Sequence, residues 1–338
     1  MKIFIHFFIV VLMTGLAEAE TKFGEPDAAR PSARSTVRLD HQTIYDATAD
    51  LVEYKKEPHL TGQIRSIGDP SFVSIWAEEF SKIYPEITFD IQMGGSKQGL
   101  EMMLQGKTDL LPISRPLTED EITQFKNHFG YEPTQVGVAF GTVGVYVNKS
   151  NPIEQLTLQQ LDAIYSADLR RGGKVVETWN DLGVTGALSK QRILRFCLGS
   201  KSGAYTLFRH AVMSGGDYRI DIEFERTAGA LVQAVGANDN GIGFAGIFYA
   251  TQRTKFVPIV VEDGRAYPPT YTHVVSGKYP LHRVVYLVIN KKPGQALNPP
   301  VLEFLRFATS RSGQRGIALI GGYPLTPELQ EKSRRQFE

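Results

Sequence analysis

The loop Gly94–Gly99 joins a predicted strand to a predicted helix and has the residue types that bind a small anion. Glycines such as Gly95 let the backbone approach a ligand closely, and Ser96 is placed to cap the helix. The free N–H groups at a helix start attract negative charge. Many turns between a strand and a helix are rich in glycine without binding anything, so this loop alone decides nothing.

A second candidate is the pair Ser114 and Arg115, where Pro116 ends a predicted strand. An arginine at the carboxyl end of a parallel strand points toward the crevice of an α/β domain. Its planar guanidinium can hold an oxyanion through two hydrogen bonds. The alternative is a surface ion pair with Glu119 or Asp120, and the sequence leaves both open.

A third loop, Gly199–Ala204, again combines serine hydroxyls, backbone N–H groups and a cation, here Lys201, Ser202 and Gly203. It is not a nucleophile elbow, because Lys201 stands where that motif needs serine. One such loop is unremarkable for an α/β protein. Three of them, rich in donors and cations and poor in acceptors, favour a site for a tetrahedral oxyanion.

The sequence gives little support for metal binding, histidine-based catalysis, a disulfide or nucleic-acid binding. The seven histidines show no paired ligand spacing, so we expect no metal, no cofactor and no histidine-based catalytic centre. The single cysteine, Cys197, excludes an intrachain disulfide and is expected to pack as a small hydrophobe within Ile193–Leu198. The formal net charge of +1 lacks the basic excess of a general nucleic-acid binder.

Strands and helices alternate along the chain, which predicts α/β layers with parallel sheets. The expected strands are Ile64–Ile67, Ile87–Gln92, Asp109–Ile113, Ile193–Cys197, Gly241–Phe244 and Val284–Asn290. The expected helices are Phe72–Tyr84, Leu100–Leu104, Ser202–Met213, Ala228–Val235 and Pro300–Thr309, with two more opened by the capping boxes Thr118–Glu121 and Thr157–Gln160.

Two further strand-like stretches, Val136–Val147 and Gly241–Phe248, are placed to carry the chain from one α/β lobe to another and back. We therefore expect a first lobe of residues 58–143 plus 249–338 and a second lobe of residues 144–248. A two-lobed protein with two crossings has a cleft between its lobes, where a ligand usually binds.

The first 19 residues have the pattern of an export signal: Lys2, an apolar run from Ile3 to Leu16, and a small-x-small cleavage site at Ala17–Ala19. The alternative, a membrane anchor, needs roughly 20 apolar residues, and this run is shorter. We expect a periplasmic, monomeric protein that is not embedded in the membrane. Residues 20–57 are polar and predict a tether or a loosely packed arm of unknown role, with one short helix around Ile44–Val52.

Taken together, the motifs resemble the phosphate-binding, substrate-binding proteins of ABC transporters, which have the type II periplasmic binding protein fold. The resemblance covers roughly residues 58–330 and rests on IQMGGSKQGLEMMLQGKTDLLPISRPLTEDE, GYEPTQVGVAFGTVGVYVNKSNPIEQLTLQQLDAIYS, TWNDLGVTG, SGAYTLF, NGIGFAGI and YPLHRVVYLVINK. It implies two α/β lobes joined by a two-stranded hinge, which close on a dehydrated phosphate.

Carried over to this chain, the resemblance implies four ligand-binding groups: Gly68, Asp69 and Ser71; Gly95 and Ser96; Ser114 and Arg115; Ser202 and Gly203. The chain departs from the family pattern at Ala204, where a threonine is usual, at Leu198, where an arginine is usual, and in the loop Gly68–Ser71. Lys201 or Arg195 could compensate for the lost donors. Asp69 could accept the proton of monohydrogen phosphate or cap a helix.

The leading hypothesis is an extracytoplasmic protein that captures phosphate and presents it to an ABC permease. A divergent paralogue for another anion, or for adhesion or signalling, is the first alternative. A secreted serine hydrolase or phosphatase using Ser202 or Ser96 is a weaker one, because no base or metal accompanies either serine. We therefore expect no enzyme activity.

Overall fold

The computed structural model describes residues 41–69, 71–200, 202–320 and 322–338. The predicted export signal, residues 1–19, and the first half of the predicted arm lie outside the described residues. Within those four ranges, no helix has both the length and the apolar character that a membrane span requires.

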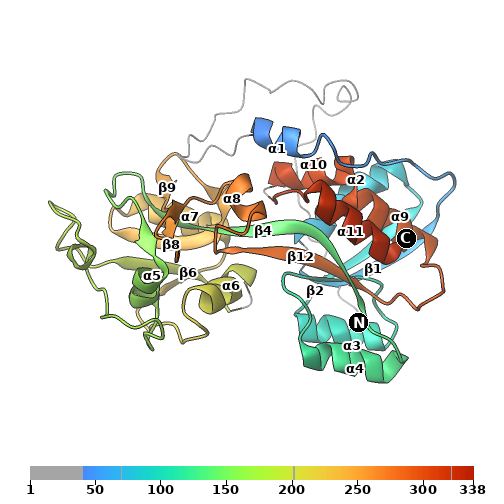
Figure 1. Ribbon diagram of the computed structural model, residues 1–338, viewed down its shortest axis with the longest axis horizontal. Coiled ribbons are helices and arrows are strands. Elements are labelled where there is room, and N and C mark those ends of the chain that lie inside the picture. The colour runs from blue at the N-terminus through green and yellow to red at the C-terminus, as the bar shows by residue number, and fades with distance from the viewer. Residues whose placement is uncertain (1–40, 70, 201, 321) are drawn as a thin grey trace, which may run out of the picture. The chain divides into compact units, whose positions relative to one another are not determined.

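The chain alternates strands and helices, as the sequence predicts (Figure 1). The helices are α1 His41–Ala47, α2 Ser71–Ile83, α3 Ser96–Leu104, α4 Glu119–Phe129, α5 Leu158–Tyr165, α6 Gly203–Ala211, α7 Ala228–Ala237, α8 Tyr271–Val275, α9 Pro299–Thr309, α10 Arg311–Ile320 and α11 Pro327–Phe337. The strands are β1 Gly62–Gly68, β2 Ile87–Met93, β3 Leu111–Ile113, β4 Thr134–Asn148, β5 Leu156–Thr157, β6 Leu194–Leu198, β7 Glu223–Glu225, β8 Gly241–Gly246, β9 Thr254–Phe256, β10 Ile259–Val260, β11 Ala266–Tyr267 and β12 His282–Ile289.

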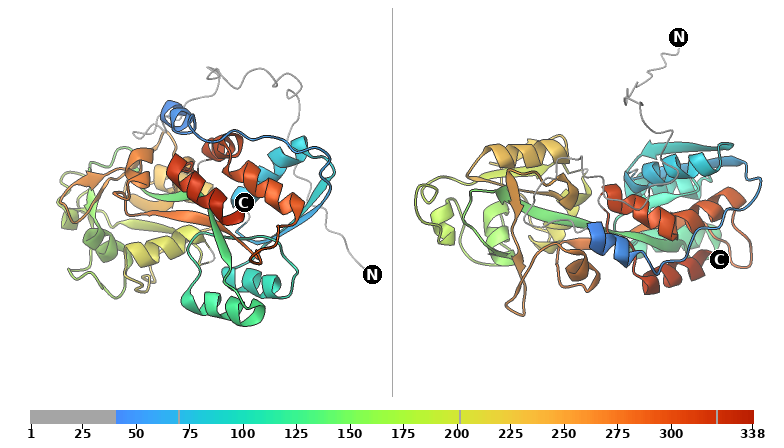
Figure 2. Two further views of the ribbon diagram at one scale, coloured as in Figure 1. Left: turned by 45° about the vertical axis from the view of Figure 1, so that its right-hand side comes forward. Right: turned by 90° about the horizontal axis from the view of Figure 1, so that it is seen from above.

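The long strand β4 belongs to two lobes at once. Its first part pairs antiparallel with β12, from Thr134 opposite Ile289 to Thr142 opposite His282. Its second part, from Val143 to Val147, pairs with β8. The sheet therefore runs β3-β12-β4-β8-β6-β7 from one lobe into the other, and β4 and β12 lie side by side where it crosses (Figures 1 and 2).

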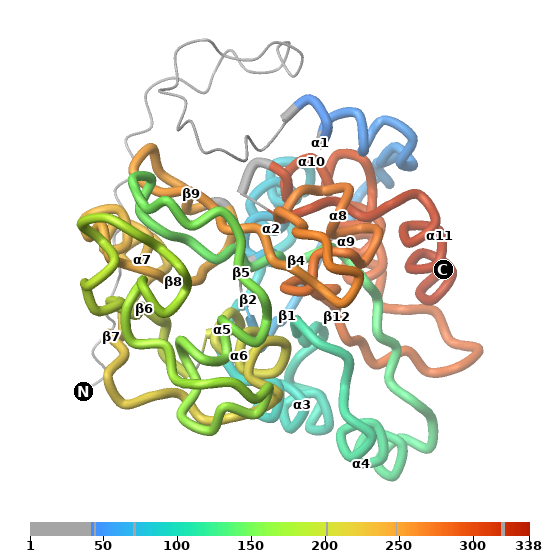
Figure 3. The backbone as a smooth tube through the Cα atoms, turned by 60° about the vertical axis from the view of Figure 1, so that its left-hand side comes forward, coloured from blue at the N-terminus to red at the C-terminus, as the bar shows by residue number. Residues whose placement is uncertain are grey.

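Each lobe has its own hydrophobic core. In lobe I, β1 and β2 pair in parallel, and a bridge between Ser66 and Leu110 brings β1 beside the start of β3. Helices α2 and α9 bury Trp76, Phe80 and Phe304 on one side of these strands. Helices α3 and α4 form a separate small core on the other side (Figure 3). The buried faces of these helices hold the ends of β1, β2 and β3 together.

The core of lobe II leads us to propose a lobe boundary that differs from the predicted one. Residues from Phe256 to Leu281 pack in one cluster with helix α5 and strands β6 and β8, whereas the sequence prediction assigned residues 249–338 to lobe I. Strand β8 also pairs within lobe II, with β4 and β6. We therefore propose that the return crossing is β12 and not Gly241–Phe248. Both stretches are short and apolar, so the sequence pattern could not distinguish a crossing strand from a buried one.

Local signals in the sequence set most helix ends correctly. The capping boxes Thr118–Glu121 and Thr157–Gln160 are both present, each with reciprocal side-chain and backbone bonds. Ser202 caps α6 by accepting from the backbone N–H of Ala204. The prediction that Ser96 caps α3 is wrong, because Gly95 is the capping residue and no side chain caps this helix. This leaves the Ser96 hydroxyl available for other bonds.

The end of the predicted arm is packed against lobe I, and its helix lies earlier than expected. Thr48 and Leu51 are buried. The backbone of Val52 bonds to the Gln330 side chain and to the Arg311 N–H group, at 3.0 and 2.8 Å. The Tyr54 hydroxyl donates to Glu303 at 3.0 Å. The expectation of a loosely packed arm is therefore wrong for this part, which joins the helices α9, α10 and α11.

Candidate functional site

Ser96 and Arg115, two of the residues singled out from the sequence, are in direct contact. The Arg115 Nη2 group donates to Ser96 Oγ at 2.7 Å. The same guanidinium makes two hydrogen bonds to the Glu121 carboxylate, at 2.7 and 2.8 Å, and one to the Pro116 carbonyl at 2.8 Å. Arg115 therefore links the first turn of α3 to the first turn of α4.

The ion pair of Arg115 is the alternative that the sequence left open, with a different acidic partner. Glu121 occupies the third position of the capping box, so its carboxylate turns back toward Arg115, whereas Glu119 and Asp120 do not. The bonds to Arg115 hold the pKa of Glu121 below its usual value. Most of the charge of Arg115 is thus balanced inside lobe I. Because Ser96 accepts from Arg115, its own hydroxyl hydrogen remains able to donate to a ligand.

Backbone bonds bring the loop after β1 beside the loop after β2. Gly94 N–H donates to the Gly68 carbonyl at 3.0 Å, and Asp69 N–H donates to the Pro112 carbonyl at 3.1 Å. A Cβ atom on Gly68 would lie 2.4 Å from that Pro112 oxygen, so the close approach requires glycine here. Three predicted segments of lobe I therefore meet at the ends of β1, β2 and β3. Ser71 begins α2, and Ser114 follows β3 as a half-buried residue.

The third predicted loop lies in lobe II, at the start of α6. The Ser202 hydroxyl accepts from Ala204 N–H at 3.2 Å, which leaves its hydrogen free to donate. Leu198 and Ala204, the two positions that depart from the family pattern, are both buried and apolar. Lys201, which the sequence singled out as a cation, lies outside the described residues.

The sequence prediction missed Arg283, which stands at the start of β12, where the chain crosses between lobes. Its Nη1 group donates to the Gly203 carbonyl of lobe II at 2.7 Å. Desolvation lowers the pKa of Arg283 to about 10, and the negative charge of Asp69 in lobe I opposes this shift. Arg283 therefore stays charged at neutral pH, contacts the predicted loop of lobe II and interacts electrostatically with Asp69 in lobe I.

A weak signal for Arg283 exists in the sequence. A charged residue immediately before the apolar run Val284–Ile289 is unusual for a strand that enters a core. The pattern does not show which loops it faces, because that depends on the pairing of β12 with β4.

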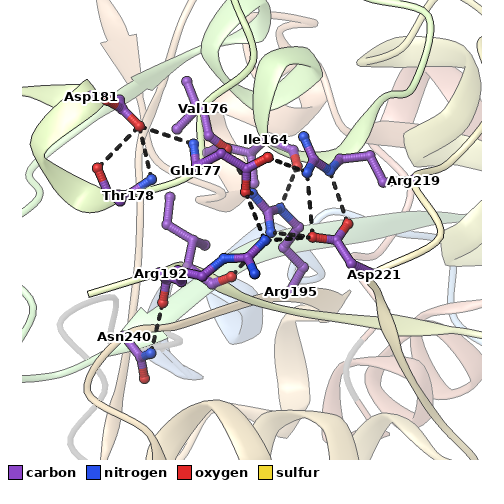
Figure 4. Close-up of polar contacts among 11 residues, drawn as sticks. Ile164, Val176, Glu177, Thr178, Asp181, Arg192, Arg195, Arg219, Asp221 and Asn240 are labelled. Carbon is purple, nitrogen blue, oxygen red and sulfur yellow. Dashed lines mark hydrogen bonds and ion pairs between the residues drawn. The ribbon is translucent and has the colours of Figure 1, made fainter. Parts of the chain in front are cut away.

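Arg195, the suggested substitute for a lost ligand-binding donor, has a structural role instead. Its side chain is 1% exposed and donates to the carbonyls of Ile164 and Val176, each at 2.6 Å. It also pairs with Glu177 and Asp221, at 3.3 and 3.1 Å. Figure 4 shows these groups gathered around its guanidinium, together with Arg192 and Arg219. These bonds occupy the donors of Arg195 with groups of lobe II, so we assign Arg195 a structural role and not a ligand-binding one.

Cys197 is buried, as predicted, and burial raises the pKa of its thiol to about 12. The described residues contain no group of three or more His, Cys, Asp or Glu side chains placed to hold a metal ion.

Comparison with known proteins agrees with this architecture. A family model described as a PBP superfamily domain matches residues 57–312. The phosphate-binding protein PstS of Pseudomonas aeruginosa is 35% identical over 292 residues, which cover 85% of this chain and 90% of that protein. Protein SphX of Synechococcus elongatus is 27% identical over 77% of this chain and 76% of its own length.

Solved structures show the same fold at lower identity. A possible phosphate-binding protein from Planctomyces limnophilus superposes with a TM-score of 0.65 at 23% identity, covering 82% of this chain and 98% of that one. A putative phosphate ABC transporter substrate-binding protein from Clostridium perfringens, solved with bound phosphate, gives a TM-score of 0.60 at 22% identity and coverage of 78% and 100%.

The fold is that of a two-lobed type II periplasmic binding protein. The chain belongs to the PBP superfamily and, within it, to the family of the phosphate-binding proteins PstS.

The buried network of lobe II predicts unequal effects for two neighbouring arginines. Arg195→Ala removes a fully buried cation and leaves three carbonyls and two carboxylates without it, which should lower the free energy of unfolding by about 3–5 kcal/mol. Arg192→Ala removes an arm of the same network that is 71% exposed, and should cost less than about 1 kcal/mol. Urea unfolding of both variants measures the difference. Equal losses would contradict the structural role of Arg195.

The Arg115–Glu121 pair predicts a pH-dependent stability. Because the folded-state pKa of Glu121 is lowered, the pair stabilises the protein above the unfolded pKa of about 4.3, and the contribution disappears as pH falls through the folded value. Glu121→Gln should therefore be less stable than the original protein at pH 7 and should approach it in acid. Urea unfolding between pH 7 and the lowest pH at which both proteins fold tests this. A constant difference across that range would contradict it.

Proposed function

We propose that this protein captures inorganic phosphate between its two lobes. The observation that carries the proposal is the position of Arg283, which bonds to the first turn of α6 in lobe II and feels the negative charge of Asp69 in lobe I at longer range. One charged group thus interacts with a loop from each lobe, by a hydrogen bond in lobe II and electrostatically in lobe I. The 35% identity to the P. aeruginosa phosphate-binding protein PstS supports phosphate as the ligand.

The proposed site contains donors of the kind that a tetrahedral oxyanion needs. The first N–H groups of α3 and α6 lack partners within their helices, and helix starts favour negative charge. The hydroxyls of Ser96 and Ser202 add two donors that their present bonds leave free. Asp69 would accept the proton of monohydrogen phosphate, a proton that sulfate lacks at neutral pH. This carboxylate would favour phosphate over sulfate.

Binding is proposed to close the lobes about the strands β4 and β12. Closure would exclude water from the anion and strengthen its hydrogen bonds, because each is stronger at low dielectric. No covalent step is needed, so we propose a binding protein and not an enzyme. By analogy with the family, the loaded protein would act outside the cytoplasm, as a monomer, and present phosphate to the permease of an ABC transporter.

Calorimetric titration of the phosphate-free, full-length mature protein tests this proposal directly. We expect heat of binding with about one phosphate per chain, and weaker or no binding of sulfate. A well-folded protein that gives no heat up to millimolar phosphate would reject the proposed ligand. Tighter binding of sulfate than of phosphate would reject the role of Asp69.

A further inference from the structure

We propose that Arg283 is the main ligand-binding cation of the site, and that residue 203 is glycine so that Arg283 can reach it. This inference rests on the proposed function and names a residue that neither the loop motifs nor Arg115 accounts for. It assigns to the crossing strand β12 a direct part in binding, beyond joining the lobes.

The first argument is the balance of charge around the two candidate arginines. Arg115 meets a carboxylate through two short hydrogen bonds, so most of its charge is neutralised within lobe I. Within the described parts of the chain, Arg283 has no carboxylate oxygen within 4.0 Å, and Asp69 acts on it only at longer range. A half-buried cation whose charge is only partly compensated is stabilised by an incoming anion. Arg283 therefore has more to gain from phosphate than Arg115.

The second argument is the number of donors that Arg283 leaves unused. A guanidinium has five N–H groups, and the one hydrogen bond of Arg283 to the described residues is that from Nη1 to the Gly203 carbonyl. Nε and Nη2 donate to none of those residues. Both donors are on the guanidinium that bonds to the first turn of α6, which is where we propose that the anion binds. They can supply the two-pronged bonding that arginine offers to an oxyanion.

The third argument is the shape of the first turn of α6. A Cβ atom on Gly203 would lie 2.2 Å from Arg283 Nη2 and 3.1 Å from Cζ. Gly203 has helical backbone, which any residue adopts, so the need for glycine does not come from its conformation. The near atom is the far end of a flexible side chain, which can move aside. A side chain at residue 203 would thus displace the guanidinium while leaving the helix intact.

This geometry also explains how the chain tolerates Leu198. The Leu198 side chain is buried in the core of lobe II at the end of β6 and offers no charge. Arg283 reaches the start of α6 from β12, through the bond of its Nη1 group to the Gly203 carbonyl. Strand β12 contributes Val285, Leu287 and Ile289 to the core of lobe I, and its Val284 packs against the core of lobe II.

The test is calorimetry with inorganic phosphate on the phosphate-free mature protein and five variants: Arg283→Gln, Arg283→Lys, Gly203→Ala, the double variant Arg283→Gln with Gly203→Ala, and Arg115→Gln. Loss of a charged hydrogen-bond donor should weaken binding by about tenfold to a hundredfold. We expect this loss for Arg283→Gln, a smaller loss for Arg283→Lys, and a smaller loss for Arg115→Gln. Arg209→Gln, in the last turn of α6 and paired with Asp217, is the matched control and should bind as the original protein does.

The double variant separates displacement of Arg283 from other effects of alanine. If Gly203→Ala acts by moving the guanidinium, the losses of phosphate affinity caused by Gly203→Ala and by Arg283→Gln should not add. The double variant should then bind phosphate with the affinity of the more weakly binding single variant, within about twofold. Additive losses would overturn the role of Gly203. Gly203→Ala should not lower the melting temperature, since alanine favours helix.

The outcomes distinguish this inference from the proposed function. If the original protein binds phosphate and Arg283→Gln binds with the same affinity, Arg283 is only a strut between the lobes and the inference is wrong. The same holds if Arg115→Gln abolishes binding while Arg283→Gln does not. If the original protein gives no heat with phosphate, the proposed function itself fails, and the role of Arg283 in phosphate binding fails with it.

Discussion

A half-buried positive charge on β12, whose only described hydrogen bond is to the Gly203 carbonyl, is the constraint on which this account depends. Arg283 keeps its charge among protein atoms, where desolvation lowers its pKa to about 10 and only Asp69 opposes the shift. Such a charge is costly unless something negative approaches it. The position of Arg283 on β12 determines where an anion can bind to it. Such an anion would lie near Asp69 of lobe I and the first turn of α6 in lobe II.

The remaining elements hold the groups around this charge. Strand β4 pairs with β12 in one half and with β8 in the other, so a single sheet carries both lobes. Arg115 fixes Ser96 against the first turn of α4, and the Gly68–Pro112 approach aligns the ends of β1 and β3. In lobe II, the bonds of Arg195 to Ile164 and Val176 tie β6 to the neighbouring segments. Two arginines that the sequence offers as ligand-binding groups thus have different roles: Arg115 positions Ser96 beside α4, and Arg195 holds the segments around β6 together.

Much of the fold follows from the sequence because its signals are local. The capping residues Thr118 and Thr157 determine helix starts through bonds within four residues. Apolar periodicity places α2 and β2 within one residue of their predicted ends. The identity of the crossing strand could not be predicted in this way. Whether residues 241–248 or 282–289 cross depends on pairing with β4, which is a property of the whole sheet.

In the site, too, contacts between residues close in the sequence were easier to predict than contacts between residues far apart in it. Ser96 and Arg115 were predicted in one site, and they come together because each follows a strand that lies beside β1 in lobe I. The partner Glu121 was missed because the capping box turns its side chain back, toward Arg115. Arg283 was missed because 80 residues separate it from Gly203, and the sequence pattern does not show that the start of β12 lies beside the start of α6.

The most direct test of this account is the crystal structure of the protein with bound phosphate. The account predicts phosphate oxygens within hydrogen-bond distance of the Arg283 guanidinium and of the first turn of α6, with Asp69 beside the same anion. An anion held by the lobe I loops alone, with Arg283 directed away from it, would contradict the account.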